Sequence, residues 1–61
     1  MNNFQKLREA AGFTQEDLAE KLNVDRTTVS KWESGSSFPR AVLLKSISEL
    51  LNCSIDDLFK R

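Results

Sequence analysis

The chain has 61 residues, of which 39% are hydrophobic and 30% charged, and its nine basic and nine acidic residues leave no net charge. This composition is typical of a single small globular domain over residues 1–61, whose core is too small to enclose a deep substrate cavity. Because there is no His and Cys53 is the only Cys, a His/Cys zinc site, an internal disulfide and a His-dependent catalytic dyad are excluded.

Three further classes of protein do not fit the sequence. Gly12 and Gly35 stand alone, so there is no Gly-rich phosphate loop. The longest apolar run, residues 41–44, is far too short to span a membrane, and residues 1–4 lack the basic and apolar blocks of a secretory signal. We therefore expect a cytoplasmic protein that has no membrane segment, metal, cofactor or catalytic residues and that works by binding.

The apolar spacing from Phe4 to Ala11 predicts a first helix, with Asn2 or Asn3 as its cap and Gly12 as a left-handed residue at its end.

The start of a second helix has a clearer signature. Thr14 and Asp17 have the spacing of a capping box, and Phe13 and Leu18 have the spacing of a hydrophobic staple across it. The buried side of this helix is expected to continue from Leu18 to Leu22.

A third helix is predicted only about three residues later. Asn23 is suited to a left-handed turn, and Asp25 is placed to cap the helix that follows. Val29 and Trp32 have the spacing of an inward face, and Gly35 ends the helix. Trp32 is therefore assigned to the core rather than to base stacking.

The remainder of the chain predicts a loop and two more helices. Residues 36–39 form the loop, and the residues from Leu43 to Leu51 supply a broad apolar helical face. Ser54 and Asp57 repeat the capping-box pattern before a short helix over Ile55–Phe59. The predicted fold class is all-α, a compact domain of five helices.

The short turn between the second and third helices has a geometric consequence. Two helices joined in this way cross steeply, which is the helix-turn-helix arrangement, and the second of the pair projects from the surface. A projecting helix fits the major groove of DNA. Arg26 can donate two hydrogen bonds to guanine, Lys31 supplies a second cation, and Thr27 and Thr28 can contact a base or a phosphate.

The distribution of charge agrees with this interpretation. Residues 26–45 carry a net charge of +3, whereas residues 1–25 carry −2 and residues 46–59 carry −3. The basic residues therefore coincide with the predicted contact helix and the loop after it, as expected for a surface that meets a polyanion.

Residues 14–35, TQEDLAEKLNVDRTTVSKWESG, closely resemble the helix-turn-helix of the lambda-repressor-like (Cro/C1, XRE) family. The resemblance covers nearly the whole chain, including the opening FQKLREAAG and the closing LLKSISELLNCSIDDLF. It implies a five-helix fold, with the helix-turn-helix formed by the second and third helices, and binding to double-stranded DNA.

The resemblance also implies roles for individual residues. Gln15 matches a residue that bonds a phosphate and braces the recognition helix, and Arg8 and Glu33 match a buried ion pair. The remaining positions read bases (Arg26, Thr27 and Lys31), flank the base readers (Thr28 and Ser30), or lie in the stretch that grips the sugar-phosphate chain (Ser34, Ser36, Ser37 and Arg40).

Four positions depart from the family pattern. Asn23 stands where Gly is usual, and Asp25 stands where an uncharged Ser or Thr is common, so its charge is expected to lower the affinity for DNA. Arg40 replaces a frequent capping Ser, and Cys53 replaces a usual Val and is interpreted as a small apolar filler.

These features predict a sequence-specific transcriptional regulator, a repressor, that reads the major groove of a two-fold operator with its third helix. One monomer reads too few base pairs for useful specificity, so a homodimer is expected. Resemblance suggests Phe38, Ile55 and Phe59 for its interface. The alternative from another class is a module that binds a partner protein, such as an antitoxin, on the same scaffold.

Overall fold

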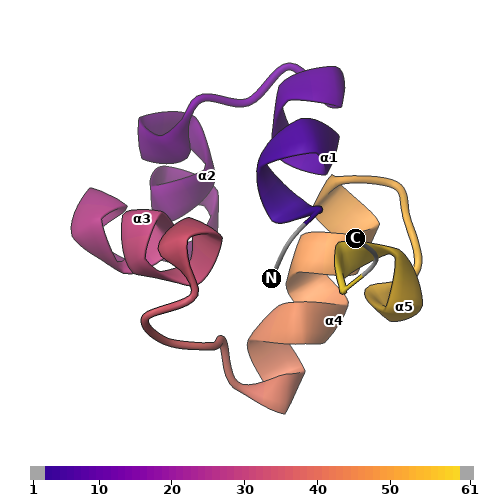
Figure 1. Cartoon of the computed structure of the whole chain (residues 1–61). Helices are drawn as coiled ribbons and strands as arrows, with labels where there is room; N and C mark the ends of the chain where they lie inside the picture. Colours follow the sequence, from indigo (N-terminus) through magenta and orange to yellow (C-terminus); the bar gives the residue numbers. More distant parts are fainter. Residues whose placement is uncertain (1–2, 60–61) are drawn as a thin grey trace.

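The computed structural model describes residues 3–59 and contains five α-helices in that part of the chain (Figure 1). They are α1 (Phe4–Ala10), α2 (Gln15–Leu22), α3 (Arg26–Ser34), α4 (Ala41–Leu50) and α5 (Ile55–Leu58). No strand occurs among the described residues, and the predicted all-α class is confirmed. None of these helices is long and apolar enough to cross a membrane.

The capping boxes that the sequence predicts are both present. Thr14 Oγ1 accepts from the Asp17 N–H at 3.0 Å, and Asp17 Oδ2 accepts from the Thr14 N–H at 3.1 Å. Ser54 and Asp57 exchange the same two bonds at 3.1 Å each. The starts of α2 and α5 are therefore determined by local hydrogen bonds.

The prediction for the start of α1 is wrong in its detail. Asn3 occupies the cap position, but its side chain makes no capping bond. Its Nδ2 donates to the Asp57 carbonyl oxygen at 2.9 Å, which ties the start of α1 to α5. Asn2, the other candidate, lies outside the described residues.

The predicted cap at Asp25, and Arg40 in the place of a usual capping Ser, also lack the side-chain bond. Asp25 precedes α3 and Arg40 precedes α4, both with extended backbones, and neither side chain bonds to the helix that follows. The Asp25 side chain is exposed, so its negative charge lies on the surface at the start of α3.

Left-handed residues separate the helices where the sequence predicts them. Asn23 has a φ of +57°, and Gly12 and Gly35 have φ values of +84° and +85°. Asn23 closes α2 and turns the chain within three residues into α3. The connection of three residues keeps the end of α2 next to the start of α3, as in a helix-turn-helix.

The core draws on every helix. α3 packs against α1 and α2, and α4 packs against α2 and α5. The rings of Phe4 and Trp32 meet edge to face, with centroids 6.2 Å apart and an interplanar angle of 79°. The other buried apolar residues are Leu18, Ala19, Leu22, Val29, Ile47, Leu51 and Leu58.

We expect Gly12→Ala to lower the free energy of unfolding by about 1–2 kcal/mol, because a Cβ disfavours the left-handed backbone. No atom lies within 4 Å of the position of that Cβ, so the loss reports backbone strain alone. Urea denaturation measures it, and Asn23→Gly, which keeps the same kind of turn, is the control and should change stability less. Equal stability of Gly12→Ala and the native protein contradicts the assignment.

Candidate nucleic-acid interface

The outward face of α3 is exposed while its inward face is anchored. Val29 and Trp32 are 0% and 2% exposed, so they hold the helix against the core. Arg26, Thr27 and Lys31 are exposed. Since residues four apart share one side of a helix, Thr27 and Lys31 present a hydroxyl and an ammonium group together to solvent.

The flanking residues lie at the edges of this face. Thr28 and Ser30 are half-buried. Just beyond, Ser34 Oγ donates to the Lys31 carbonyl oxygen at 3.1 Å and lies 3.0 Å from Ser36 Oγ. These bonds order the end of α3 and the loop that follows.

Two further predicted contact residues follow α3. Ser37 is half-buried in the loop, and Arg40 is exposed directly before α4. The structure thus places the predicted contact residues from Arg26 to Arg40 on one helix and on the loop that continues from it.

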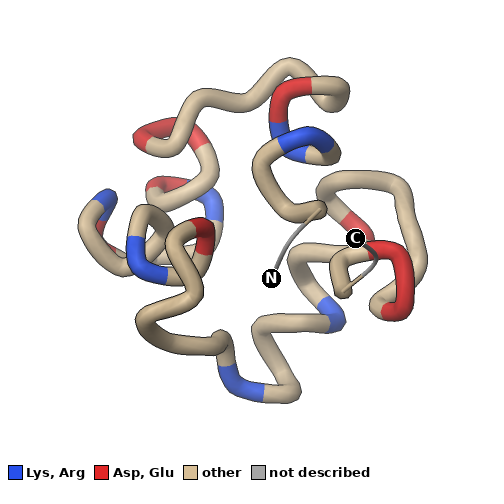
Figure 2. The backbone as a smooth tube through the Cα atoms, in the orientation of Figure 1, with Lys and Arg blue, Asp and Glu red and all other residues tan. Residues whose placement is uncertain are grey.

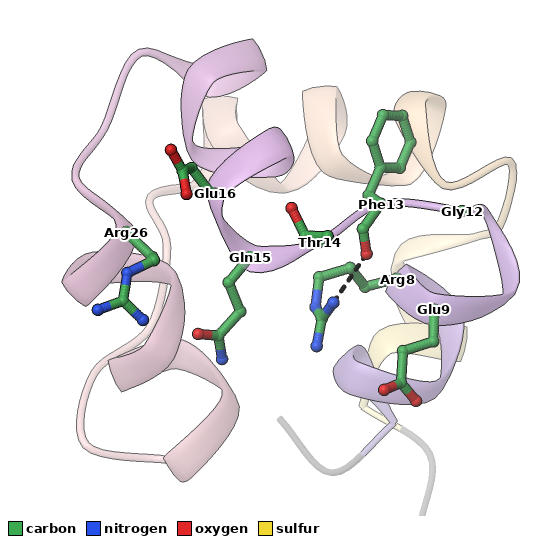
Figure 3. A pocket seen from close by; sticks show the side chains of 8 residues that line it. All are labelled: Arg8, Glu9, Gly12, Phe13, Thr14, Gln15, Glu16 and Arg26. Carbon is green, nitrogen blue, oxygen red and sulfur yellow. Dashed lines mark hydrogen bonds between the residues drawn. The ribbon is translucent and has the colours of Figure 1, made fainter.

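A shallow groove adjoins the start of α3 (Figure 3). Its walls come from the end of α1, the α1–α2 loop and the start of α2, with Arg26 on the α3 side. Gln15 extends from the first position of α2 into the space between Arg26 and Arg8 (Figure 3). At this end of α2 the N–H groups of Gln15 and Glu16 have no acceptor within the helix, and the positive end of the helix dipole is opposed by the carboxylates of Glu16 and Asp17 in the first turn.

A buried ion pair lies beside the groove and joins α1 to α3. Arg8 Nε donates to Glu33 Oε2 at 2.5 Å, and both side chains are 8% exposed. Arg8 Nη1 also donates to the Phe13 carbonyl oxygen at 2.7 Å. Gln15 Nε2 donates to Glu33 Oε1 at 2.9 Å. The pair and the bracing bond from Gln15 to the recognition helix are confirmed.

Charge is unevenly distributed along the chain (Figure 2). Basic segments mark α3, the chain just before α4 and α4 itself, whereas α5 is acidic (Figure 2). The exposed members of the basic group are Arg26, Lys31, Arg40 and Lys45. Their positions put cations at both ends of the predicted contact stretch.

Exposed large apolar side chains among the described residues lie outside α3. The three predicted for a dimer interface are exposed by 63% (Phe38), 40% (Ile55) and 44% (Phe59). Val42, which the sequence reasoning did not select, is 71% exposed. Its position four residues after Phe38, outside the periodicity of the buried face of α4, was the available signal.

Cys53 packs against the core as a half-buried residue. Burial and, to a lesser extent, the Asp57 carboxylate raise the pKa of its thiol. A thiol that stays protonated at neutral pH is a poor nucleophile, which agrees with its interpretation as an apolar filler.

The sequence model of the family described as Helix-turn-helix matches residues 4–58 of this chain. The chain belongs to the lambda-repressor-like (Cro/C1, XRE) helix-turn-helix family. Members of this family are DNA-binding regulators of transcription and not enzymes, and the observed arrangement of α2 and α3 is the one that gives the family its name.

Named relatives of this helix-turn-helix protein regulate transcription in both directions. The HTH-type transcriptional activator BcrR of Enterococcus faecalis is 50% identical over 54 residues, which cover 88% of this chain and 26% of that protein. The cryptic phage CTXphi transcriptional repressor RstR of Vibrio cholerae is 35% identical over 54 residues, which cover 88% of this chain and 48% of that protein.

The match also extends to an archaeal relative. An HTH-type transcriptional regulator of Archaeoglobus fulgidus is 38% identical over 55 residues, covering 90% of this chain and 79% of its own length. The chain thus spans about a quarter of the activator, about half of the repressor and most of the archaeal protein.

We expect Glu33→Leu to destabilise the fold by about 3–5 kcal/mol, because it leaves the Arg8 guanidinium buried without its counter-charge. Urea denaturation of this variant and of the double variant Arg8→Met/Glu33→Leu provides the comparison. The double variant should be more stable than Glu33→Leu alone, since no unpaired charge remains in the core. Additive losses from the two substitutions contradict a direct coupling between the two side chains.

Proposed function

We propose that this chain is a sequence-specific DNA-binding regulator whose α3 lies in the major groove of a two-fold operator. The observation that carries the proposal is the exposed polar and basic face of α3, which Val29 and Trp32 hold rigidly from behind. In a member of a DNA-binding family, that face has the shape and the donors that the major groove accepts.

Base recognition is assigned to three residues of α3. Arg26, at the first position of the helix, donates two hydrogen bonds to guanine O6 and N7. Thr27 contacts a thymine methyl group or bonds a base edge, and Lys31 reaches a further base acceptor one turn along the groove. Thr28 and Ser30, at the half-buried edges of the face, contact the adjacent backbone.

Phosphate contacts are assigned to the residues on either side of α3. The side chain of Gln15 and the N–H groups of Gln15 and Glu16 bind one phosphate, since a helix N-terminus favours an anion. On the other side, Arg40 and the serines at positions 34, 36 and 37 follow the sugar-phosphate chain. These contacts set the register of α3 in the groove but carry no sequence information.

The two-fold operator follows from the small size of the reading surface. A single α3 reads about 4–6 base pairs, and each is worth about 1–3 kcal/mol of discrimination. Two copies on half-sites about one helical turn apart double that information. The exposed apolar side chains of Phe38, Ile55 and Phe59 are the candidates for the contact between copies.

Repression is the proposed outcome of binding in the cytoplasm. Occupancy of a promoter is sufficient to exclude RNA polymerase, whereas activation requires an additional favourable contact with it. The relatives include a named activator and a named repressor, so the direction has to be measured.

A second candidate function is binding of a partner protein, as in an antitoxin. It is favoured by the exposed acidic side chains of α2, Glu16, Asp17 and Glu20, together with zero net charge. DNA affinity that falls steeply with salt distinguishes the regulator from this module, because counterion release accompanies phosphate binding.

Selection from random double-stranded oligonucleotides with the purified protein tests the main proposal. We expect an enriched motif of two inverted half-sites with centres about one turn of DNA apart. Enrichment of no sequence contradicts the proposal, and a single unrepeated half-site contradicts the two-fold arrangement.

We expect Arg26→Ala to weaken binding to the selected operator by about 1–3 kcal/mol and to relax the preference at one base position. Titrations against the operator and its single-base variants measure both effects. Lys6→Ala, which removes the same charge from an exposed position on α1, is the matched control and should leave base preference unchanged. An intact preference in Arg26→Ala refutes its reading role.

We expect Gln15→Ala to weaken binding by a similar factor on every sequence, because a phosphate contact is independent of the base pair. The same titrations measure this variant on the operator and on unrelated DNA. A loss confined to one base position contradicts the assignment of Gln15 to the backbone.

We expect a reporter gene behind the selected operator to be silenced when the protein is expressed, and silencing to be lost with Arg26→Ala. Reporter output with and without the protein measures the direction of control. Increased output from the same promoter contradicts repression and supports activation.

A further inference from the structure

We infer that Glu33 is the positioning residue for the phosphate contact of Gln15, fixing which end of the Gln15 carboxamide faces the DNA. This inference rests on the proposed function and deepens it, because it concerns how that contact is prepared before DNA arrives. Glu33 itself lies too deep to touch DNA, with only 8% of its side chain exposed.

The orientation follows from the chemistry of the Glu33 carboxylate. Both of its oxygens face donors: Oε2 accepts from Arg8 Nε at 2.5 Å, and Oε1 accepts from Gln15 Nε2 at 2.9 Å and from Arg8 Nη2 at 3.4 Å. An ionised carboxylate only accepts hydrogen bonds. The Gln15 carboxamide must therefore turn its nitrogen toward Glu33. In the reverse orientation its oxygen would face a carboxylate oxygen, and both atoms are acceptors.

The same bond prepares the other side of the carboxamide. Its nitrogen carries two N–H bonds, so the bond to Glu33 leaves a second donor for an acceptor in the groove. Gln15 is half-buried and extends into that groove between Arg26 and Arg8 (Figure 3). A phosphate oxygen needs a donor there, and a carboxamide free to rotate would present its oxygen part of the time.

The ion pair holds the positioning group in place. Arg8 engages both Glu33 and the Phe13 carbonyl oxygen, at 2.7 Å, directly before the start of α2. The carboxylate, the α1–α2 loop and the first residue of α2 are therefore connected by hydrogen bonds from three helices. Because the Gln15 side chain is already ordered, DNA binding does not lose further conformational entropy at this residue.

The first test is a double-variant cycle on DNA affinity, with Gln15→Ala, Glu33→Gln and both together. Glu33→Gln keeps the size of the side chain, but the introduced carboxamide can offer either a donor or an acceptor to Gln15. We expect Gln15→Ala to weaken binding about tenfold in the native background. In the Glu33→Gln background the same change should have a much smaller effect, because the orientation is already lost.

Stability has to be separated from positioning. Titrations are made at a temperature where circular dichroism shows every variant to be folded, and Ile47→Val, a buried position in α4 outside this network, is the control for weakened packing. The control should bind DNA like the native protein. Independent, multiplying effects of the Gln15 and Glu33 substitutions overturn the positioning role.

The second test observes the carboxamide directly and needs no DNA. In nitrogen-15 NMR spectra, Gln5, which is exposed on α1, is an internal reference for a freely rotating carboxamide. We expect one side-chain N–H of Gln15 to be shifted and protected from exchange relative to Gln5, and the difference to collapse in Glu33→Gln. Identical behaviour of Gln15 and Gln5 in the native protein overturns the inference.

The two tests also separate this inference from the proposed function. If neither Arg26→Ala nor Gln15→Ala changes DNA affinity, the proposed function fails, whereas the NMR comparison still decides whether Glu33 orients Gln15. If Arg26→Ala weakens binding and Gln15→Ala does not, DNA reading by α3 stands and the phosphate-positioning role of Glu33 is refuted.

Discussion

The turn between α2 and α3 is the constraint on which the recognition surface depends. Asn23 takes a left-handed conformation with φ of +57°, and α3 begins three residues later. In a helix-turn-helix, so short a connection joins two helices that cross steeply. Val29 and Trp32 are the buried residues of α3. The opposite face of this helix is therefore turned to solvent.

The buried pair of Arg8 and Glu33 joins this arrangement to the remainder of the fold. The two residues are 25 positions apart and link the helix that begins the domain to the end of the recognition helix. A buried ion pair adds little net stability, because its attraction offsets the loss of hydration. Its value here is geometric, since it requires α1, α2 and α3 to meet at one point and supplies an acceptor to Gln15.

Zero net charge does not conflict with binding to a polyanion. Exposed cations outnumber exposed acids from α3 to Lys45, whereas acids outnumber cations on α2 and α5 (Figure 2). At physiological salt, charges separated by more than about 8 Å are largely screened, so in the proposed complex the charges next to α3 act on DNA more strongly than those farther away. Two acids lie next to this surface: Asp25 has an exposed carboxylate at the start of α3, and Glu16 lines the groove beside Arg26.

Most of the local structure could be predicted from sequence alone. The capping boxes at Thr14 and Ser54 and the left-handed turns at Gly12 and Asn23 depend on neighbours within four residues, so the local pattern determines them. The same holds for the face of α3, because a period of 3.6 residues separates Val29 and Trp32 from Thr27 and Lys31.

Only the tertiary structure decided the hydrogen-bond partner of a side chain that could bond either a near or a distant residue of the chain. Asn3 could cap α1, yet it bonds to Asp57, which lies 54 positions away. The Gln15 carboxamide donates to Glu33, which lies 18 positions away. The physical reason is that a local and a long-range hydrogen bond have similar strength, so the bond that forms depends on which partner lies within reach in space. The spacing of residues along the sequence does not give that distance.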